Sequence, residues 1–127
     1  MRIGITGASG LIGSALTTHL QQQGHETVAF VRREPRSASE ISWQPGTDLD
    51  PGRLSGLDAI VHLAGAGVGD KRWTDSYKEV IRSSRVDGTQ TIARAMAAAD
   101  DGPRVLVSGS AIGYYGDTGD RLTDETG

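Results

Sequence analysis

Three glycines near the N-terminus constrain the fold of this chain more than any other feature. Gly7, Gly10 and Gly13 lie between an isoleucine-containing stretch and a stretch whose apolar residues recur at helical spacing. This order predicts a buried strand over residues 2–6, a tight turn, and a helix over residues 10–23. In such a turn the first glycine permits the sharp bend, the second lets a ligand approach the main chain, and the third lets the helix lie close to the strand.

The start of that helix predicts which ligand approaches. The first amide groups of a helix have no acceptor within it, and the helix dipole places partial positive charge there, so an anion binds favourably. A phosphate group is therefore expected on the residues of this turn, which are Gly7, Ser9, Gly10, Leu11, Ile12 and Gly13. The alternative is that these glycines serve only the turn and the packing of the helix.

Strand and helix patterns alternate along the rest of the chain. Strands are expected over residues 26–31, 41–43, 57–64 and 104–108, and a long helix over residues 74–99, with a loop over residues 44–55. The alternation predicts an α/β fold, a truncated Rossmann-type doubly wound parallel sheet with strand order 3-2-1-4-5. With 127 residues and one apparent core, residues 1–127 are expected to form a single domain.

Composition narrows the classes of partner. A net charge of −3 argues against nucleic acid. The absence of cysteine, and histidines without a shared spacing, predict no metal site, and His62 is expected to be a hydrogen-bonded core residue. No apolar run approaches the roughly 20 residues that span a bilayer, so no membrane partner is expected. The chain opens directly on a strand without a signal peptide, which predicts a cytoplasmic location.

The residues that follow the second expected strand bear on which dinucleotide binds. In NAD proteins an acidic residue at this place holds the ribose 2′-hydroxyl. Here Arg32 and Arg33 stand there instead, and guanidinium groups match a 2′-phosphate. The pattern therefore favours NADP(H) over NAD(H). The alternative is a solvated basic loop in an NAD protein, with Glu34 as the ribose ligand.

Besides the glycine turn, six segments of the sequence carry a family likeness, namely residues 61–65, 70–73, 81–85, 88–89, 107–111 and 113–116. Together they resemble a known family, the NAD(P)-dependent epimerase/dehydratases. Within the extended short-chain dehydrogenase/reductases they look like an atypical branch described as nucleoside-diphosphate-sugar epimerase-like. The resemblance covers essentially the whole chain and corresponds to the N-terminal part of the family only.

The resemblance implies roles for individual residues. The backbone of Leu63, Ala64 and Gly65 would pass beside the ribose and pyrophosphate of the cofactor. Arg85 stands where the family usually has asparagine, so it either reaches the cofactor phosphates or pairs with a carboxylate such as Asp87.

The resemblance also implies candidate catalytic residues. Ser110 matches the serine that hydrogen-bonds the reacting oxygen of the substrate. Tyr114 lies in the adjacent loop, where its phenol would donate a proton or line the pocket, and packing on the sheet edge is the alternative. The family's Tyr-x-x-x-Lys pair, which allows acid/base chemistry near neutral pH, is absent, because no tyrosine of this chain has lysine four residues later.

These observations predict the NADP(H)-binding part of an epimerase, dehydratase or reductase-like enzyme that acts by hydride transfer on a small molecule, which in this family is usually a nucleotide sugar. Because the family's substrate-binding part is missing, we expect a fragment that binds cofactor without turnover. The alternative is a non-catalytic NADP-binding or redox-sensing module. A third expectation is self-association, as a homodimer through the helix over residues 74–99 or through the exposed edge of the last strand.

Overall fold

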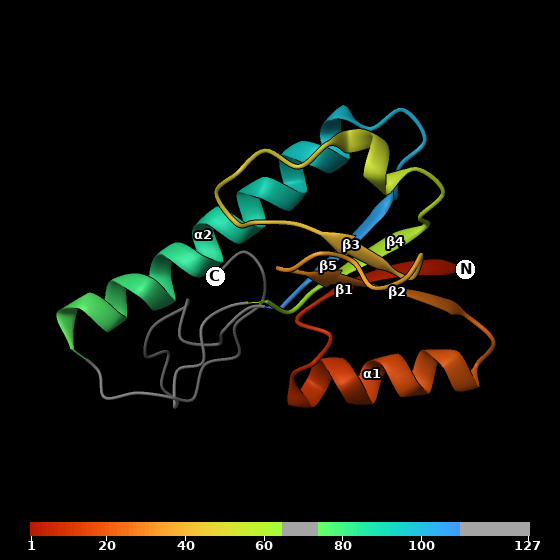
Figure 1. Ribbon diagram of the computed structural model, residues 1–127, viewed down its shortest axis with the longest axis horizontal. Coiled ribbons are helices and arrows are strands. Elements are labelled where there is room, and N and C mark those ends of the chain that lie inside the picture. The colour runs from red at the N-terminus through yellow and green to blue at the C-terminus, as the bar shows by residue number, and fades with distance from the viewer. Residues whose placement is uncertain (65–73, 110–127) are drawn as a thin grey trace, which may run out of the picture.

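Five parallel strands form one sheet in the computed structural model, which describes residues 1–64 and 74–109. The order across the sheet is β3-β2-β1-β4-β5, which confirms the predicted α/β fold and its strand order. Two α-helices and a short 3-10 helix accompany the sheet (Figure 1). The elements along the chain are β1 (Arg2–Thr6), α1 (Leu11–Gln22), β2 (Glu26–Val31), β3 (Glu40–Ser42), η1 (Pro51–Leu54), β4 (Ala59–His62), α2 (Asp75–Ala98) and β5 (Val105–Ser108).

The structure departs from the sequence expectations mainly in the segment between β3 and β4. We expected a loop over residues 44–55, but residues 51–54 form η1. Pro51 stands in its first turn, where a missing N–H costs nothing, and the Asp50 carboxylate accepts a hydrogen bond of 3.0 Å from the Gly52 amide. β4 is also shorter than the apolar run that predicted it, and covers residues 59–62.

One face of the sheet packs against α2 and η1 and holds the main hydrophobic core. Gly4 has no side chain there because a Cβ atom would lie 2.7 Å from the Phe30 ring. Trp43 packs edge-on against Phe30, with 6.3 Å between the ring centroids. The buried residues of this core are Val28, Phe30, Trp43, Leu49, Leu54, Leu57, Ile60, Ile92 and Ala95.

On the opposite face, α1 packs against β1 and β2 (Figure 1). Val105 and Val107 are in register with Ala59 and Val61, and side chains in register on parallel strands project from the same face. The two valines are 52% and 54% exposed. Within the described residues, β5 therefore presents two exposed apolar side chains at the edge of the sheet.

Helix α2 begins where the sequence predicted it. The Thr74 hydroxyl accepts a hydrogen bond of 3.2 Å from the Tyr77 amide and so caps the first turn. Gly88 continues the helix rather than ending it, and it faces the His62 ring on β4, which would lie 3.4 Å from a Cβ atom at this position. Among the helices of the described residues, none is long and apolar enough to cross a membrane.

Candidate functional site

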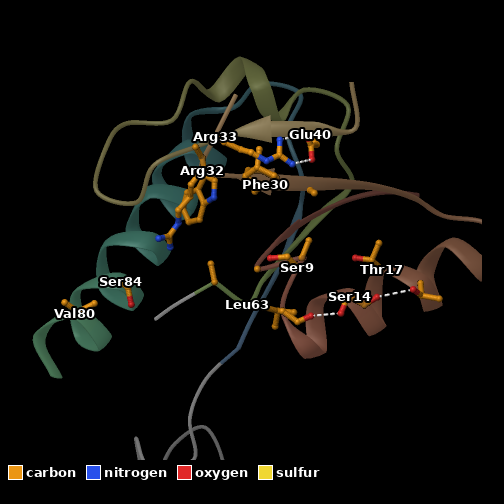
Figure 2. Close-up of a pocket in the computed structure, with 18 residues that line it drawn as sticks. Ser9, Ser14, Thr17, Phe30, Arg32, Arg33, Glu40, Leu63, Val80 and Ser84 are labelled. Atoms are coloured by element: carbon orange, nitrogen blue, oxygen red, sulfur yellow. Dashed lines mark hydrogen bonds and ion pairs between the residues drawn. The ribbon is translucent and has the colours of Figure 1, made fainter. Parts of the chain in front are cut away.

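The carboxyl ends of β1, β2 and β4 meet at an open cavity of about 1020 Å³. Figure 2 shows Ser9, Ser14 and Thr17 on one side of it, Val80 and Ser84 of α2 on another. The cavity lies at the edge of the sheet where open α/β folds bind ligands. Its lining consists of Gly7, Ala8, Ser9, Gly10, Ser14, Thr17, Thr18, Ala29, Phe30, Val31, Arg32, Arg33, Glu40, Trp43, Leu63, Ala64, Val80 and Ser84.

The three glycines of the first turn have different surroundings. Gly7 adopts a φ of +68°, and a Cβ atom there would lie 2.9 Å from the Leu63 carbonyl carbon. A Cβ atom on Gly13 would collide with the Gly7 carbonyl. Gly10, in contrast, has only the Gly7 carbonyl oxygen near its Cβ position, at 3.4 Å. Gly7 and Gly13 are therefore needed for the backbone path, whereas Gly10 leaves open space beside the cavity.

The first turn of α1 presents its amides to this space. Gly10 is the N-cap residue, and among the described residues no side chain accepts a hydrogen bond from the turn's amides. The Ser14 hydroxyl is turned away from them, because it donates to the Gly10 carbonyl at 2.6 Å. The turn contains no acidic residue that would neutralise the positive end of the helix dipole. The turn can therefore bind an anion.

Thr6 and His62 form a buried polar pair that is hydrogen-bonded to the backbone of residues 63–64, which lines the cavity. The Thr6 hydroxyl lies 2.7 Å from Nδ1 of His62, and it accepts amide hydrogen bonds from Leu63 at 3.0 Å and Ala64 at 3.1 Å. A hydroxyl has two lone pairs and one proton. Because both lone pairs are used by amides, the proton must be donated to the imidazole. This contact fixes the backbone of residues 63–64 beside the glycine turn.

The count of lone pairs and protons at the Thr6 hydroxyl also determines the protonation state of His62. Its Nδ1 accepts a hydrogen bond, so the ring is the neutral tautomer with its proton on Nε2. Burial lowers the pKa of His62, which agrees with a neutral ring. Trp43 packs edge-on against the imidazole with 6.1 Å between centroids. His62 is thus the hydrogen-bonded core residue expected from the sequence.

Two adjacent arginines at the end of β2 line the cavity, but they have different contacts. Arg33 forms a bidentate ion pair with Glu40, at 2.9 and 2.7 Å. Arg33 holds the pKa of the Glu40 carboxyl down to about 2, with a further contribution from the Arg36 backbone N–H. Within the described part of the chain the structure gives the exposed guanidinium of Arg32 no such partner. Figure 2 shows the ion pair as a dashed line at the rim of the cavity.

The structure brings many of the predicted cofactor residues into one place. Those that line the cavity are Gly7, Ser9, Gly10, Arg32, Arg33, Leu63 and Ala64.

Other predicted site residues do not line the cavity. Leu11 and Ile12 are 90% and 69% exposed and are not among the residues that line the cavity. Gly13 lies inside the turn, and Arg85 is exposed on α2 outside the cavity lining. Predictions for Gly65, Ser110 and Tyr114 fall outside the described residues. The described residues contain no group of three or more acidic, histidine or cysteine side chains that could hold a metal ion.

Among the residues of the site that sequence reasoning did not identify are Thr6, Glu40 and Trp43. Thr6 offered a signal, since it stands directly before the first glycine at the end of a strand. Trp43 also offered one, because it follows a short strand at the ligand-binding edge. Glu40 gave no local signal, because its role depends on an ion pair formed only by the folded loop.

Known proteins resemble this chain over most of its length. A family model, the NAD dependent epimerase/dehydratase family, matches residues 3–127. An epimerase family protein of Mycobacterium bovis is 41% identical over 124 residues, which are 97% of this chain and 40% of that protein.

Two solved structures extend the comparison. A nucleoside-diphosphate sugar epimerase from Corynebacterium glutamicum is 40% identical with a TM-score of 0.76, over 95% of this chain and 25% of that one. Human epimerase family protein SDR39U1 with NADPH is 30% identical with a TM-score of 0.74, over 91% of this chain and 38% of that one. The chain spans about 40% of the length of its Mycobacterium relative. From the matched residues and this fold, the chain belongs to the NAD-dependent epimerase/dehydratase family, as the sequence resemblance predicted.

Proposed function

We propose that this chain binds NADP(H), in preference to NAD(H), as the cofactor-binding part of an epimerase, dehydratase or reductase-like enzyme. The observation that carries the proposal is the glycine turn. It offers uncapped helix amides and a side-chain-free position at Gly10 to a cavity that also contains the Arg32 guanidinium. Amides and an arginine that line one cavity match the two phosphate groups of NADP(H), the pyrophosphate and the 2′-phosphate.

The residues present fit the cofactor in a definite order. The turn from Gly7 to Gly13 would hold the pyrophosphate by its amides, and the 2′-phosphate would lie beside the cationic segment that follows β2, which contains Arg32 and Arg33. The backbone of residues 63–64, fixed by the Thr6 hydroxyl, would lie beside the ribose. The solved human relative with NADPH supports this choice of dinucleotide, whereas the family description names NAD.

When bound, the nicotinamide ring supplies a place from which a hydride is donated or at which one is accepted. The family resemblance assigns the remaining roles, all of them proposals. Ser110 would donate a hydrogen bond to the reacting oxygen of the substrate, and Tyr114 would hold or release the proton. Gly65 and Arg85 would extend the cofactor contacts. A nucleotide sugar is the proposed substrate class, in keeping with the name of the Corynebacterium relative.

One observation favours a second candidate, a non-catalytic NADP-binding or redox-sensing module. No tyrosine of these 127 residues has lysine four residues later. Activity assays of the full-length protein with and without nucleotide sugars would separate the two. Substrate turnover would eliminate the non-catalytic candidate, whereas binding without turnover would support it.

The direct test is calorimetric titration of the chain with NADPH and with NADH. We expect NADPH to bind more tightly, and Arg32→Asp to reverse the preference because a carboxylate there repels the 2′-phosphate and accepts a hydrogen bond from the ribose. Arg36→Asp is the matched control, since it makes the same charge change on the same loop outside the cavity lining. A chain that binds neither nucleotide at millimolar concentration would refute the proposed function.

A further inference from the structure

The two arginines that follow β2 are equivalent in sequence but not in structure. Both terminal nitrogens of Arg33 are engaged, because they donate to the two carboxylate oxygens of Glu40 at 2.9 and 2.7 Å. Nη1 of Arg33 donates in addition to the Glu34 carbonyl at 3.0 Å. The charge of Arg33 is therefore already balanced by a carboxylate, so this guanidinium attracts a phosphate less strongly than an unpaired one, although within the described residues its Nε–H stays available.

Arg32 has the opposite character. Its guanidinium has no hydrogen bond or ion pair within the part of the chain that the structure describes. It lines the main cavity and also a smaller neighbouring cavity of about 300 Å³ beyond Trp43. Arg32 therefore lies between the two cavities, and no ion pair within the described residues balances its charge.

Glu40, the first residue of β3, is the carboxylate that pairs with Arg33. Its carboxylate lines the main cavity, and its Oε1 also accepts a hydrogen bond of 2.7 Å from the Arg36 amide, which closes the loop between β2 and β3. Arg33 keeps the pKa of this carboxyl at about 2, so Glu40 is ionised at neutral pH. An ionised carboxylate at the rim would repel a 2′-phosphate unless a cation balanced it, and Arg33 is that cation.

We infer that Arg32 alone binds the 2′-phosphate, while Glu40, through its ion pair with Arg33, sets how strongly the chain prefers NADP(H) over NAD(H). The inference rests on the proposed function and assigns different roles to Arg32, Arg33 and Glu40. Arg33 acts as a charge-balancing partner rather than as a phosphate ligand. Glu40 is the specificity-determining residue, because its charge weakens the attraction that two free arginines would exert.

The test compares 2′,5′-ADP with 5′-AMP, two probes that differ only in the 2′-phosphate. Affinities are measured by calorimetry at one fixed salt concentration for Arg32→Met, Arg33→Met, Glu40→Gln and the Arg33→Met/Glu40→Gln double variant. Glutamine retains an acceptor for the Arg36 amide, so the loop keeps its closure. The substituted side chains lie at the cavity rim rather than in the hydrophobic core, and thermal unfolding of each variant verifies the fold.

For 2′,5′-ADP, Arg32→Met should lower affinity about 10- to 100-fold, as expected for loss of a charge-assisted hydrogen bond. Arg33→Met should lower it about two- to fivefold by exposing Glu40, and Glu40→Gln should raise it by a similar factor. The double variant should return to within about twofold of the unmodified chain. Binding of 5′-AMP should change less than about twofold in every variant.

Two results would overturn the division of labour. One is a double variant that remains as weak as Arg32→Met, which would make Arg33 a direct phosphate ligand. The other is an Arg32→Met variant whose affinity for 2′,5′-ADP is unchanged. Failure of the proposed function looks different, because the unmodified chain would then bind neither probe and neither dinucleotide, and the inference would fall with it.

Discussion

Thr6 and His62 connect the ends of β1 and β4 through a hydroxyl–imidazole hydrogen bond of 2.7 Å. The same hydroxyl accepts the amides of Leu63 and Ala64, so three hydrogen bonds converge on one buried oxygen. Because residues 63–64 form one wall of the cavity, the shape of that wall depends on a single side chain of the neighbouring strand.

The Thr6 hydroxyl should therefore contribute measurably to stability. Thr6→Val keeps the shape of the side chain but leaves the Ala64 amide and an imidazole nitrogen without their partner, while the Leu63 amide keeps only its longer contact of 3.3 Å with the Thr6 carbonyl. We expect the free energy of unfolding to fall by about 1–3 kcal/mol in urea denaturation. Thr6→Ser, which retains the hydroxyl, should lose less than the valine variant. Equal stability of the valine variant and the unmodified chain would contradict the network.

Stability should also depend on pH through His62. Burial lowers the pKa of this imidazole in the folded chain below its usual 6.5, so the unfolded chain binds more protons as the pH falls. The contribution is fully present above pH 6.5 and is lost progressively below it. We expect the free energy of unfolding, measured by denaturant titration across this range, to decrease toward acid. His62→Gln cannot titrate, so its stability curve should be flatter, and parallel curves would contradict the assignment.

Gly10 and Gly13 should separate folding from ligand binding. Gly13→Ala places a methyl group against the Gly7 carbonyl and should cost about 1–3 kcal/mol of stability. Gly10→Ser meets no clash, and serine is a good N-cap residue, so stability should be kept or raised by about 0.3 kcal/mol.

Nucleotide affinity should respond to Gly10→Ser in the other direction. The hydroxymethyl group occupies the space left for the phosphate and caps the amides that would bind it, so NADPH affinity should fall about tenfold or more. Denaturant unfolding and calorimetric titration measure the two effects separately. An affinity equal to that of the unmodified chain would mean that the phosphate does not lie on this turn.

Self-association remains a prediction with a direct test. Val86 of α2 is 40% exposed and Val107 of β5 is 54% exposed. If the chain dimerises through α2, Val86→Lys should give a monomer in size-exclusion chromatography with light scattering, while Val107→Lys should leave the dimer intact. The reverse pattern would assign the interface to the sheet, and a monomer before any substitution would refute the dimer.

The sequence predicted the sheet well because its signals are local. The glycine turn orients β1 and α1, and apolar runs bounded by glycine and proline reveal the other strands, so the strand order followed from general rules of α/β folds. The sequence did not predict η1, because four residues are too few to show helical periodicity. Its one local signal was Asp50 followed by Pro51, a capping pair that composition alone does not distinguish from a loop.

The cavity was less predictable because its decisive contacts join distant residues. Thr6 and His62 are 56 positions apart, and the residues around each of them give no sign of their contact. Arg32 and Arg33 are identical in type and adjacent, so the sequence assigned them the same role. Only the folded loop shows that Glu40 engages one arginine and not the other.

The open space at Gly10 has an evolutionary consequence. The other two glycines of the turn are held in place by selection for a folded protein, since any side chain there collides with the main chain. Under the proposed function, the constraint on position 10 comes from the nucleotide rather than from the backbone path. A lineage that no longer needed the nucleotide would therefore lose this glycine first, and the loss would be silent in any screen for expression or solubility. Relatives can accordingly be compared at position 10 to ask which of them retain nucleotide binding.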